Sequence, residues 1–139
     1  MATLVEPDGW TCRQLHPMFG VELTGHRIGA SLDRDLRDGI VAAVHRHGLV
    51  AMPDQSLSDD DLHDFARSIG RVPDSTVLSG RSAGVFHLTN LDSDGNIVPR
   101  DDKIARRNVA NELWHTDSTY LRPRASISML YGRIVPPVG

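Results

Sequence analysis

A histidine and an aspartate two positions apart, His115 and Asp117, are the residues of this chain best suited to chemistry. Their segment is rich in β-branched and aromatic residues, which favours a strand. Strand side chains alternate between faces, so both would emerge on the same side, whereas on a helix they would diverge. A nitrogen and an oxygen ligand side by side would supply two of the three ligands of a 2-His-1-carboxylate iron(II) site. The same triplet also arises by chance from two ordinary surface residues.

The composition is that of a folded domain. The 139 residues fit a single domain, and 40% hydrophobic with 24% charged residues is a globular balance. A net charge of -3 gives no reason to expect binding to nucleic acid or to a membrane surface. Cys12 is the single cysteine, which excludes an internal disulfide and a cysteine-based zinc or iron–sulfur site. With neither a long apolar run nor a signal-peptide pattern, we expect a cytoplasmic protein.

The first half of the chain should build the elements that hold such a site. Apolar spacing and capping residues predict an irregular start over 1–10, two short strands within 11–24, a helix over 33–47, a buried strand over 49–52 and a helix between Ser58 and Gly70. His16-Pro17 separates the first two strands, because a residue before proline is pushed to extended geometry.

The sequence of the second half of the chain predicts mainly strands. The sequence favours strands over 85–90 and 125–135, a tight turn over 92–96 and a solvated, charged loop over 97–107. The order strand, helix, strand, helix and then strands predicts a β-rich α+β domain covering residues 1–139.

Other chemistries lack their motifs. No Gly-x-Ser-x-Gly, Walker or dinucleotide glycine pattern occurs in the sequence. The remaining histidines have no acidic or nucleophilic partner at a telling spacing and are better explained as structural residues. His87 is a partial exception, because a strand over 85–90 could bring it near the site as a substrate or supporting contact.

The residues around the pair resemble those of a known family. The relevant stretches are Asn111-Glu112-Leu113-Trp114-His115-Thr116-Asp117-Ser118-Thr119-Tyr120, then Pro123, Ala125, Ser128-Met129-Leu130 and Val135-Pro136-Pro137. They resemble the iron-binding region of taurine dioxygenase-type enzymes, and within that superfamily the 2,4-dichlorophenoxyacetate dioxygenase branch. The N-terminal half agrees through His16-Pro17-Met18-Phe19, Gly48-Leu49-Val50, Asp54-Gln55-Ser56-Leu57-Ser58 and Phe65-Ala66-Arg67-Ser68-Ile69-Gly70.

The resemblance implies the N-terminal half of a double-stranded β-helix (jelly-roll) with two flanking helices. It implies Fe(II) as cofactor and 2-oxoglutarate as co-substrate, with His115 and Asp117 as metal ligands and catalytic residues and Asn111 as a substrate contact. The implied reaction uses O2 to hydroxylate a small anionic substrate, an aryloxyalkanoate such as 2,4-dichlorophenoxyacetate. The ether is then cleaved, with release of succinate and CO2.

The chain departs from the family pattern at its end. The family's 2-oxoglutarate threonine and arginine and its third iron ligand would fall beyond residue 139. We therefore expect a truncated N-terminal portion of a catalytic domain that is inactive alone. Two alternatives stay open: a dioxygenase for a sulfonate or another small carboxylate, or a complete, non-catalytic interaction module. Homo-oligomer formation by the full-length protein is also open.

Overall fold

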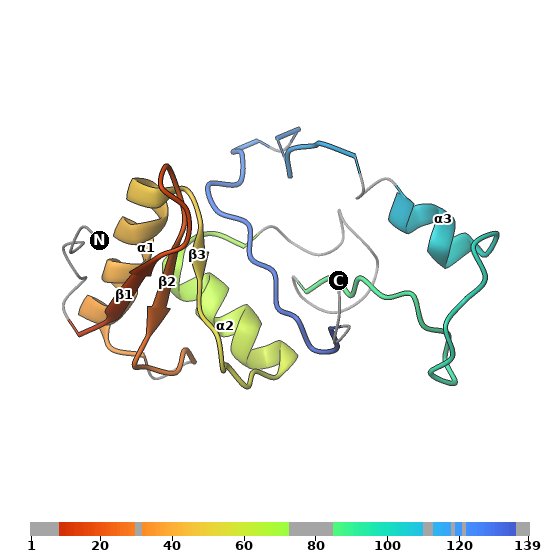
Figure 1. Cartoon of the computed structure of the whole chain (residues 1–139), viewed down its shortest axis with the longest axis horizontal. Helices are drawn as coiled ribbons and strands as arrows, with labels where there is room; N and C mark the ends of the chain where they lie inside the picture. The colour runs from red at the N-terminus through yellow and green to blue at the C-terminus, as the bar shows by residue number, and fades with distance from the viewer. Residues whose placement is uncertain are drawn as a thin grey trace. The chain divides into compact units, whose positions relative to one another are not determined.

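The computed structural model of this chain describes residues 9–29, 32–72, 85–109, 113–117, 119–120 and 122–135. These residues belong to two units, Met1–Val85 and Phe86–Gly139, which we call unit 1 and unit 2 and describe separately. Unit 1 holds a three-stranded sheet with helices α1 and α2, and unit 2 holds helix α3 (Figure 1). None of the described helices is long and apolar enough to cross a membrane.

The sheet of unit 1 starts with the predicted hairpin. β1 (Thr11–Gln14) runs antiparallel to β2 (Val21–Thr24), and β3 (Val50–Ala51) pairs with β2 in parallel. The loop between β1 and β2 closes where the Leu15 N–H donates to the Gly20 carbonyl at 3.0 Å. Gly20 has a φ of 79°, which is open to glycine at little cost. The strands predicted on both sides of His16-Pro17 are confirmed.

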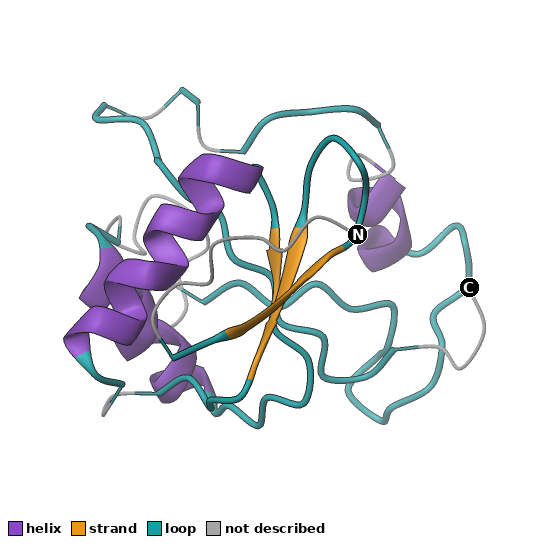
Figure 2. Cartoon of the chain, turned by 60° about the vertical axis from the view of Figure 1, so that its left-hand side comes forward, coloured by secondary structure: helices purple, strands orange, loops and turns teal. Residues whose placement is uncertain are grey.

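Both predicted helices form, and both end at the predicted residues. α1 (Arg34–His47) begins at Asp33, whose side chain accepts from the Asp35 N–H, and ends at Gly48 with a left-handed φ of 73°. α2 (Asp59–Ile69) begins with a capping box, in which Ser58 and Asp61 each accept a hydrogen bond from the other's backbone N–H. Figure 2 shows α1 and α2 on one side of the sheet.

The core of unit 1 lies between this sheet and the two helices. Its buried apolar side chains come from β2, both helices and two loops: Trp10, Val21, Leu23, Ile40, Ala43, Leu57 and Phe65. The prediction of an irregular start missed Trp10, which is only 1% exposed and donates its indole N–H to the Leu36 carbonyl at 3.1 Å. Trp10 thereby ties the residues just before β1 to α1.

Unit 2 contains a helix that the sequence did not predict. α3 (Lys103–Val109) forms where we expected a solvated loop over 97–107. The turn before it is closed by a hydrogen bond from the Asp102 N–H to the Pro99 carbonyl at 3.0 Å. The charged run lacks the apolar periodicity by which helices are recognised, and for this reason no helix was predicted there.

The predicted turn over 92–96 is confirmed. The Asp92 carboxylate accepts hydrogen bonds from the N–H groups of Asp94 at 2.9 Å and Asn96 at 2.8 Å. These donors favour the charged carboxylate, so the pKa of Asp92 lies below its usual range, with the Asn96 N–H as the main cause. A single β-bridge between Leu91 and Ile97 closes the turn.

The strands predicted for the second half are not formed in the described residues. Residues 85–90, 113–117 and 122–135 have irregular backbone, and the described residues of unit 1 form a sheet of three short strands. The α+β class is thus confirmed, whereas β-rich character is not seen in the described part of the chain. A strand needs a paired neighbour to satisfy its backbone groups, and no described segment of unit 2 offers one beyond the 91–97 bridge.

Candidate metal centre

The structure brings His115 and Asp117 together. The imidazole Nε2 of His115 lies 3.3 Å from the Oδ1 of Asp117, and both side chains are about half exposed. The segment has a bend at Leu113 and a turn at Asp117 instead of the predicted strand, so the strand argument for their shared face is wrong. The expected proximity is nevertheless found.

The other imidazole nitrogen is fixed by the backbone. Nδ1 of His115 lies 2.7 Å from the carbonyl oxygen of Leu113. A carbonyl can only accept, so Nδ1 must carry the proton of this hydrogen bond. In the neutral ring, Nε2 then presents its lone pair toward Asp117. Metal-binding histidines characteristically donate their second N–H to a carbonyl or carboxylate in this way.

The pair fits a divalent metal ion. Ligand atoms about 2.1 Å from such an ion and at right angles to each other would be about 3.0 Å apart, close to the observed 3.3 Å. A nitrogen lone pair and a carboxylate oxygen at that distance repel each other unless a proton or a cation lies between them. Imidazole and carboxylate are also two of the donors of the iron(II) facial triad.

The described residues do not provide a third ligand. No group of three His, Cys, Asp or Glu side chains that could hold a metal ion occurs among them. His87, the additional histidine considered from the sequence, is exposed on irregular backbone and does not complete such a group. Asn111, predicted to contact substrate, lies outside the described residues. The ligand roles of His115 and Asp117 stay predictions.

Unit 2 has one side-chain contact before the pair in the sequence and one that spans Asp117. Before it, the Asn108 side chain at the end of α3 donates to the Thr89 carbonyl at 2.7 Å, which holds α3 against the segment leading into the 92–96 turn. Around Asp117, the hydroxyl oxygens of Thr116 and Thr119 lie 3.3 Å apart. Sequence reasoning missed the Leu113 carbonyl, because every residue carries that group and its direction depends on the backbone.

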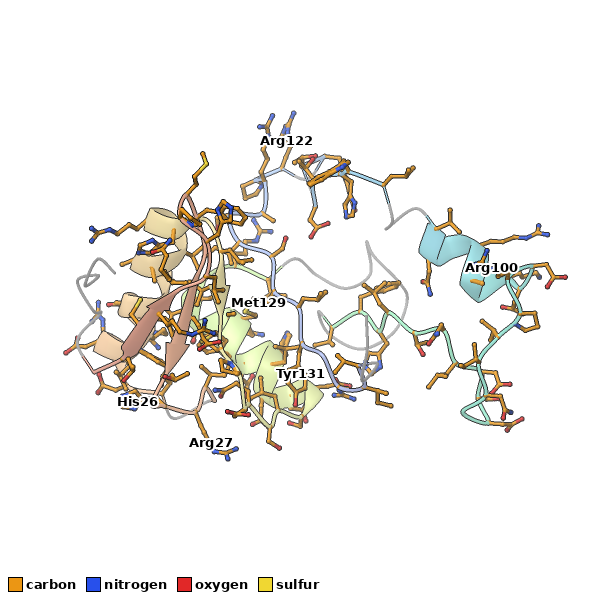
Figure 3. All side chains as sticks on the ribbon, viewed as in Figure 1. His26, Arg27, Arg100, Arg122, Met129 and Tyr131 are labelled. Atoms are coloured by element: carbon orange, nitrogen blue, oxygen red, sulfur yellow. The ribbon has the colours of Figure 1, made fainter. Side chains whose placement is uncertain are left out.

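A second polar region in unit 1 has a structural explanation. A shallow depression lies between the loops after β2 and β3 and is lined by Thr24, Gly25, His26, Arg27, Pro53, Asp54 and Gln55. The Gln55 amide donates to the carbonyls of His26 and Pro53 and accepts from the Ile28 N–H, joining the two loops. His26, labelled with Arg27 in Figure 3, contacts the Gly9 carbonyl and packs edge-on against Trp10.

An α+β fold that carries a paired histidine and aspartate on an irregular segment is a candidate for metal binding. Residues 11–139 match the family described as "Taurine catabolism dioxygenase TauD, TfdA family". Because this match covers nearly the whole chain, the chain belongs to the TauD/TfdA family.

Individual relatives agree with this assignment. The chain is 30% identical over 131 residues to an alpha-ketoglutarate-dependent 2,4-dichlorophenoxyacetate dioxygenase of Cupriavidus pinatubonensis, covering 90% of this chain and 46% of that protein. It is 29% identical over 128 residues to an (S)-phenoxypropionate/alpha-ketoglutarate-dioxygenase of Delftia acidovorans, covering 84% and 42%. The chain therefore spans less than half the length of these curated relatives.

A solved structure has the same fold. The crystal structure of AAD-2 in complex with Mn(II) and N-oxalylglycine superposes with a TM-score of 0.70 at 23% identity, covering 81% of this chain and 41% of that chain. At this identity the likeness shows the fold alone.

Proposed function

We propose that this chain supplies two metal ligands, His115 and Asp117, to the active site of an Fe(II)- and 2-oxoglutarate-dependent dioxygenase. The observation that carries the proposal is the 3.3 Å approach of Nε2 to Oδ1, with Nδ1 held by the Leu113 carbonyl. Membership of the TauD/TfdA family supports it, as does the alpha-ketoglutarate dependence stated in the names of the relatives.

Each residue of the site has a definite task. The His115 imidazole and the Asp117 carboxylate hold the iron, which with 2-oxoglutarate and O2 supplies the oxidising chemistry of the site. The Leu113 carbonyl keeps the Nδ1 proton in place, so that Nε2 stays free for the metal. Asn111, four positions before His115, is proposed to contact the substrate.

The proposed substrate is a small aryloxyalkanoate, such as 2,4-dichlorophenoxyacetate. Relatives named for 2,4-dichlorophenoxyacetate and for phenoxypropionate support this choice over a sulfonate. One oxygen atom of O2 enters the substrate as a hydroxyl on the carbon beside the ether oxygen, and the other enters succinate as 2-oxoglutarate loses CO2. The hydroxylated ether then collapses to a phenol and an oxo-acid.

The site needs further residues to work. We propose that the complete domain is a cytoplasmic double-stranded β-helix, of which this chain is the N-terminal portion. The third metal ligand and the groups that bind 2-oxoglutarate would come from the part of the domain that the relatives have and this chain does not span. The 139-residue chain alone is therefore expected to form no succinate.

The test is a substitution series in the complete protein that contains this chain. His115→Ala and Asp117→Ala should each lower 2-oxoglutarate-dependent succinate formation by more than about 100-fold, because even residues that only support a ligand contribute 10- to 100-fold. His45→Ala, which changes an exposed histidine on α1 in unit 1, is the control and should keep near-normal activity. Tens of per cent of activity retained by Asp117→Ala would contradict the assignment.

A further inference from the structure

The His115–Asp117 pair lies in a part of the chain whose described residues bury no side chain fully. From residue 86 onward, every described residue with an assigned exposure is half-buried or exposed. Packing against a buried core therefore does not fix the two side chains within the described part of unit 2. The contacts that the structure shows around them are local, because they join groups only a few residues apart in the sequence.

Electrostatics opposes the approach of the two side chains. With the Nδ1 proton on the Leu113 carbonyl, the neutral ring turns the Nε2 lone pair toward the Asp117 Oδ1, 3.3 Å away. Two acceptor atoms at this distance repel each other unless a proton or a cation lies between them. A metal-free site therefore tends to open, so each of the two side chains needs a restraint that keeps it facing the other.

His115 has its restraint in the Leu113 carbonyl, which lies 2.7 Å from Nδ1 and fixes the rotation of the ring. The Asp117 carboxylate is placed differently. Among the described residues, its one polar contact is the approach to the His115 ring. The restraint on Asp117 therefore has to act through the backbone that carries it.

Two threonines, one on each side of Asp117, provide such a restraint. The hydroxyl oxygens of Thr116 and Thr119 lie 3.3 Å apart, so that one hydroxyl can donate to the other. Asp117 and Thr119 belong to a turn. A side-chain contact between residues three positions apart limits the backbone dihedral angles of the residues between them, as hydroxyl groups do in other turns. Asp117 is one of the residues that this contact spans.

We infer that Thr119, acting with Thr116, is a positioning residue for Asp117. The contact between the two hydroxyls holds the Asp117 backbone in the turn that directs its carboxylate toward Nε2 of His115 before any metal binds. Neither hydroxyl touches the metal or the substrate in this scheme. The inference rests on the proposed function only in taking Asp117 as a metal ligand.

The expected effect is on metal affinity and is modest. Partners that orient a metal ligand typically contribute about 10- to 100-fold to metal affinity. The Thr116–Thr119 distance is longer than that of a usual hydroxyl hydrogen bond, and both side chains are exposed, so the contact is weak. We therefore expect a loss of about three- to tenfold in affinity when one hydroxyl is removed. Saturating metal should restore kcat.

The experiment measures Co(II) binding by calorimetry to the complete protein that contains this chain, without 2-oxoglutarate. Thr119→Val removes the hydroxyl but keeps the branched shape, and should raise the Kd by about three- to tenfold. Thr119→Ser keeps the hydroxyl and should bind Co(II) as the parent does. Thr116→Val should match Thr119→Val, and the double variant should be no weaker than either, because both remove one contact. Thr11→Val, at an exposed position on β1 in unit 1, is the matched control.

The inference is supported by weaker Co(II) binding in both single valine variants, parent-like binding in Thr119→Ser and Thr11→Val, and a kcat that saturating Fe(II) restores. Parent-like affinity in Thr119→Val overturns it, and so do additive losses in the double variant. Equal weakening by Thr119→Ser, or a loss of circular dichroism in Thr119→Val, also overturns it, because either would indicate a general role in the fold.

Asp117→Ala separates a failure of this inference from a failure of the proposed function. Weak Co(II) binding by Asp117→Ala together with parent-like binding by Thr119→Val would refute the positioning role alone. Parent-like binding by Asp117→Ala would refute the proposed function, since the carboxylate would then be no ligand, and would overturn the positioning role with it.

Discussion

The two units of this chain divide the buried core and the proposed metal ligands between them. Unit 1 has a sheet, two capped helices and a buried core, but its polar contacts serve the fold. Unit 2 has the His115–Asp117 pair and one short helix, and its described residues include no fully buried side chain. Local signals are therefore sufficient to build unit 1, whereas the described residues around the His115–Asp117 pair include no buried core.

The largest difference in stability is expected between alanine variants of two phenylalanines, one in each unit. Phe65 is 1% exposed in the core of unit 1, and Phe86 is 46% exposed in unit 2. Phe65→Ala should lower the free energy of unfolding by about 3 to 5 kcal/mol, and Phe86→Ala by less than about 1 kcal/mol. Urea unfolding followed by circular dichroism measures both. Similar losses would mean that the two units share one core.

A smaller loss of stability is expected when the hydrogen bonds of Gln55, which join the loops after β2 and β3 in unit 1, are removed. Gln55→Ala removes hydrogen bonds to Ile28, His26 and Pro53 and should cost about 1 to 3 kcal/mol. Gln14→Ala is the control, because the Gln14 amide donates only locally, to the His16 carbonyl. Thermal unfolding of the two variants gives the comparison. A Gln14→Ala variant as unstable as Gln55→Ala would show that the connection between loops is not what matters.

Ser58 in unit 1 and Asp92 in unit 2 both accept hydrogen bonds from backbone N–H groups, so removing each side chain compares how much such a contact stabilises its unit. Ser58→Ala removes the N-cap of α2 and should destabilise unit 1 by about 1 kcal/mol. Asp92→Ala removes the equivalent acceptor from the turn in unit 2 and should leave the main unfolding transition unchanged. The same urea titration reports both, and a clear shift for Asp92→Ala would make unit 2 part of the cooperative core.

The smallest expected effect is a pH dependence of the stability that an ion pair on the sheet contributes. Arg13 on β1 forms an ion pair with Glu22 on β2 at 2.7 Å. The hydrogen bond from Arg13 lowers the pKa of Glu22 below its ordinary 4.5. The contribution of a lowered carboxyl pKa is present above pH 4.5 and is lost as the pH falls through the folded-state pKa.

The stability difference between the parent chain and Glu22→Gln should accordingly shrink to nothing under strongly acidic conditions. Unfolding at a series of pH values measures this difference. A difference that stays constant, or grows as the pH falls, would contradict the role of the ion pair.

The sequence was most informative where the deciding contacts are local. Asp33 and Gly48 bound α1, and Ser58 bounds α2, because capping depends on groups within a few residues. The proximity of His115 and Asp117 was likewise predicted, since a spacing of two limits how far apart they can be.

The predictions that failed mostly concern residues whose structure depends on contacts far away in the sequence. The strand predicted over 125–135 needs a neighbouring strand, which the described residues do not supply. Trp10 is buried by α1, whose residues come over twenty positions later, and nothing in the first ten residues indicates that contact. The α3 helix carries charges without an apolar stripe, so periodicity could not reveal it.

The chain has two tryptophans, one in each unit, so their fluorescence can report on the two units separately. Trp10 is 1% exposed and packs 5.0 Å from the His26 ring, whereas Trp114 is fully exposed and adjoins His115 in the sequence. Emission from Trp10 should thus report the integrity of the sheet and helices. Emission from Trp114 should be open to acrylamide and should be quenched by a paramagnetic ion such as Co(II) bound at the neighbouring pair. One spectrum can therefore follow folding and metal loading as separate signals.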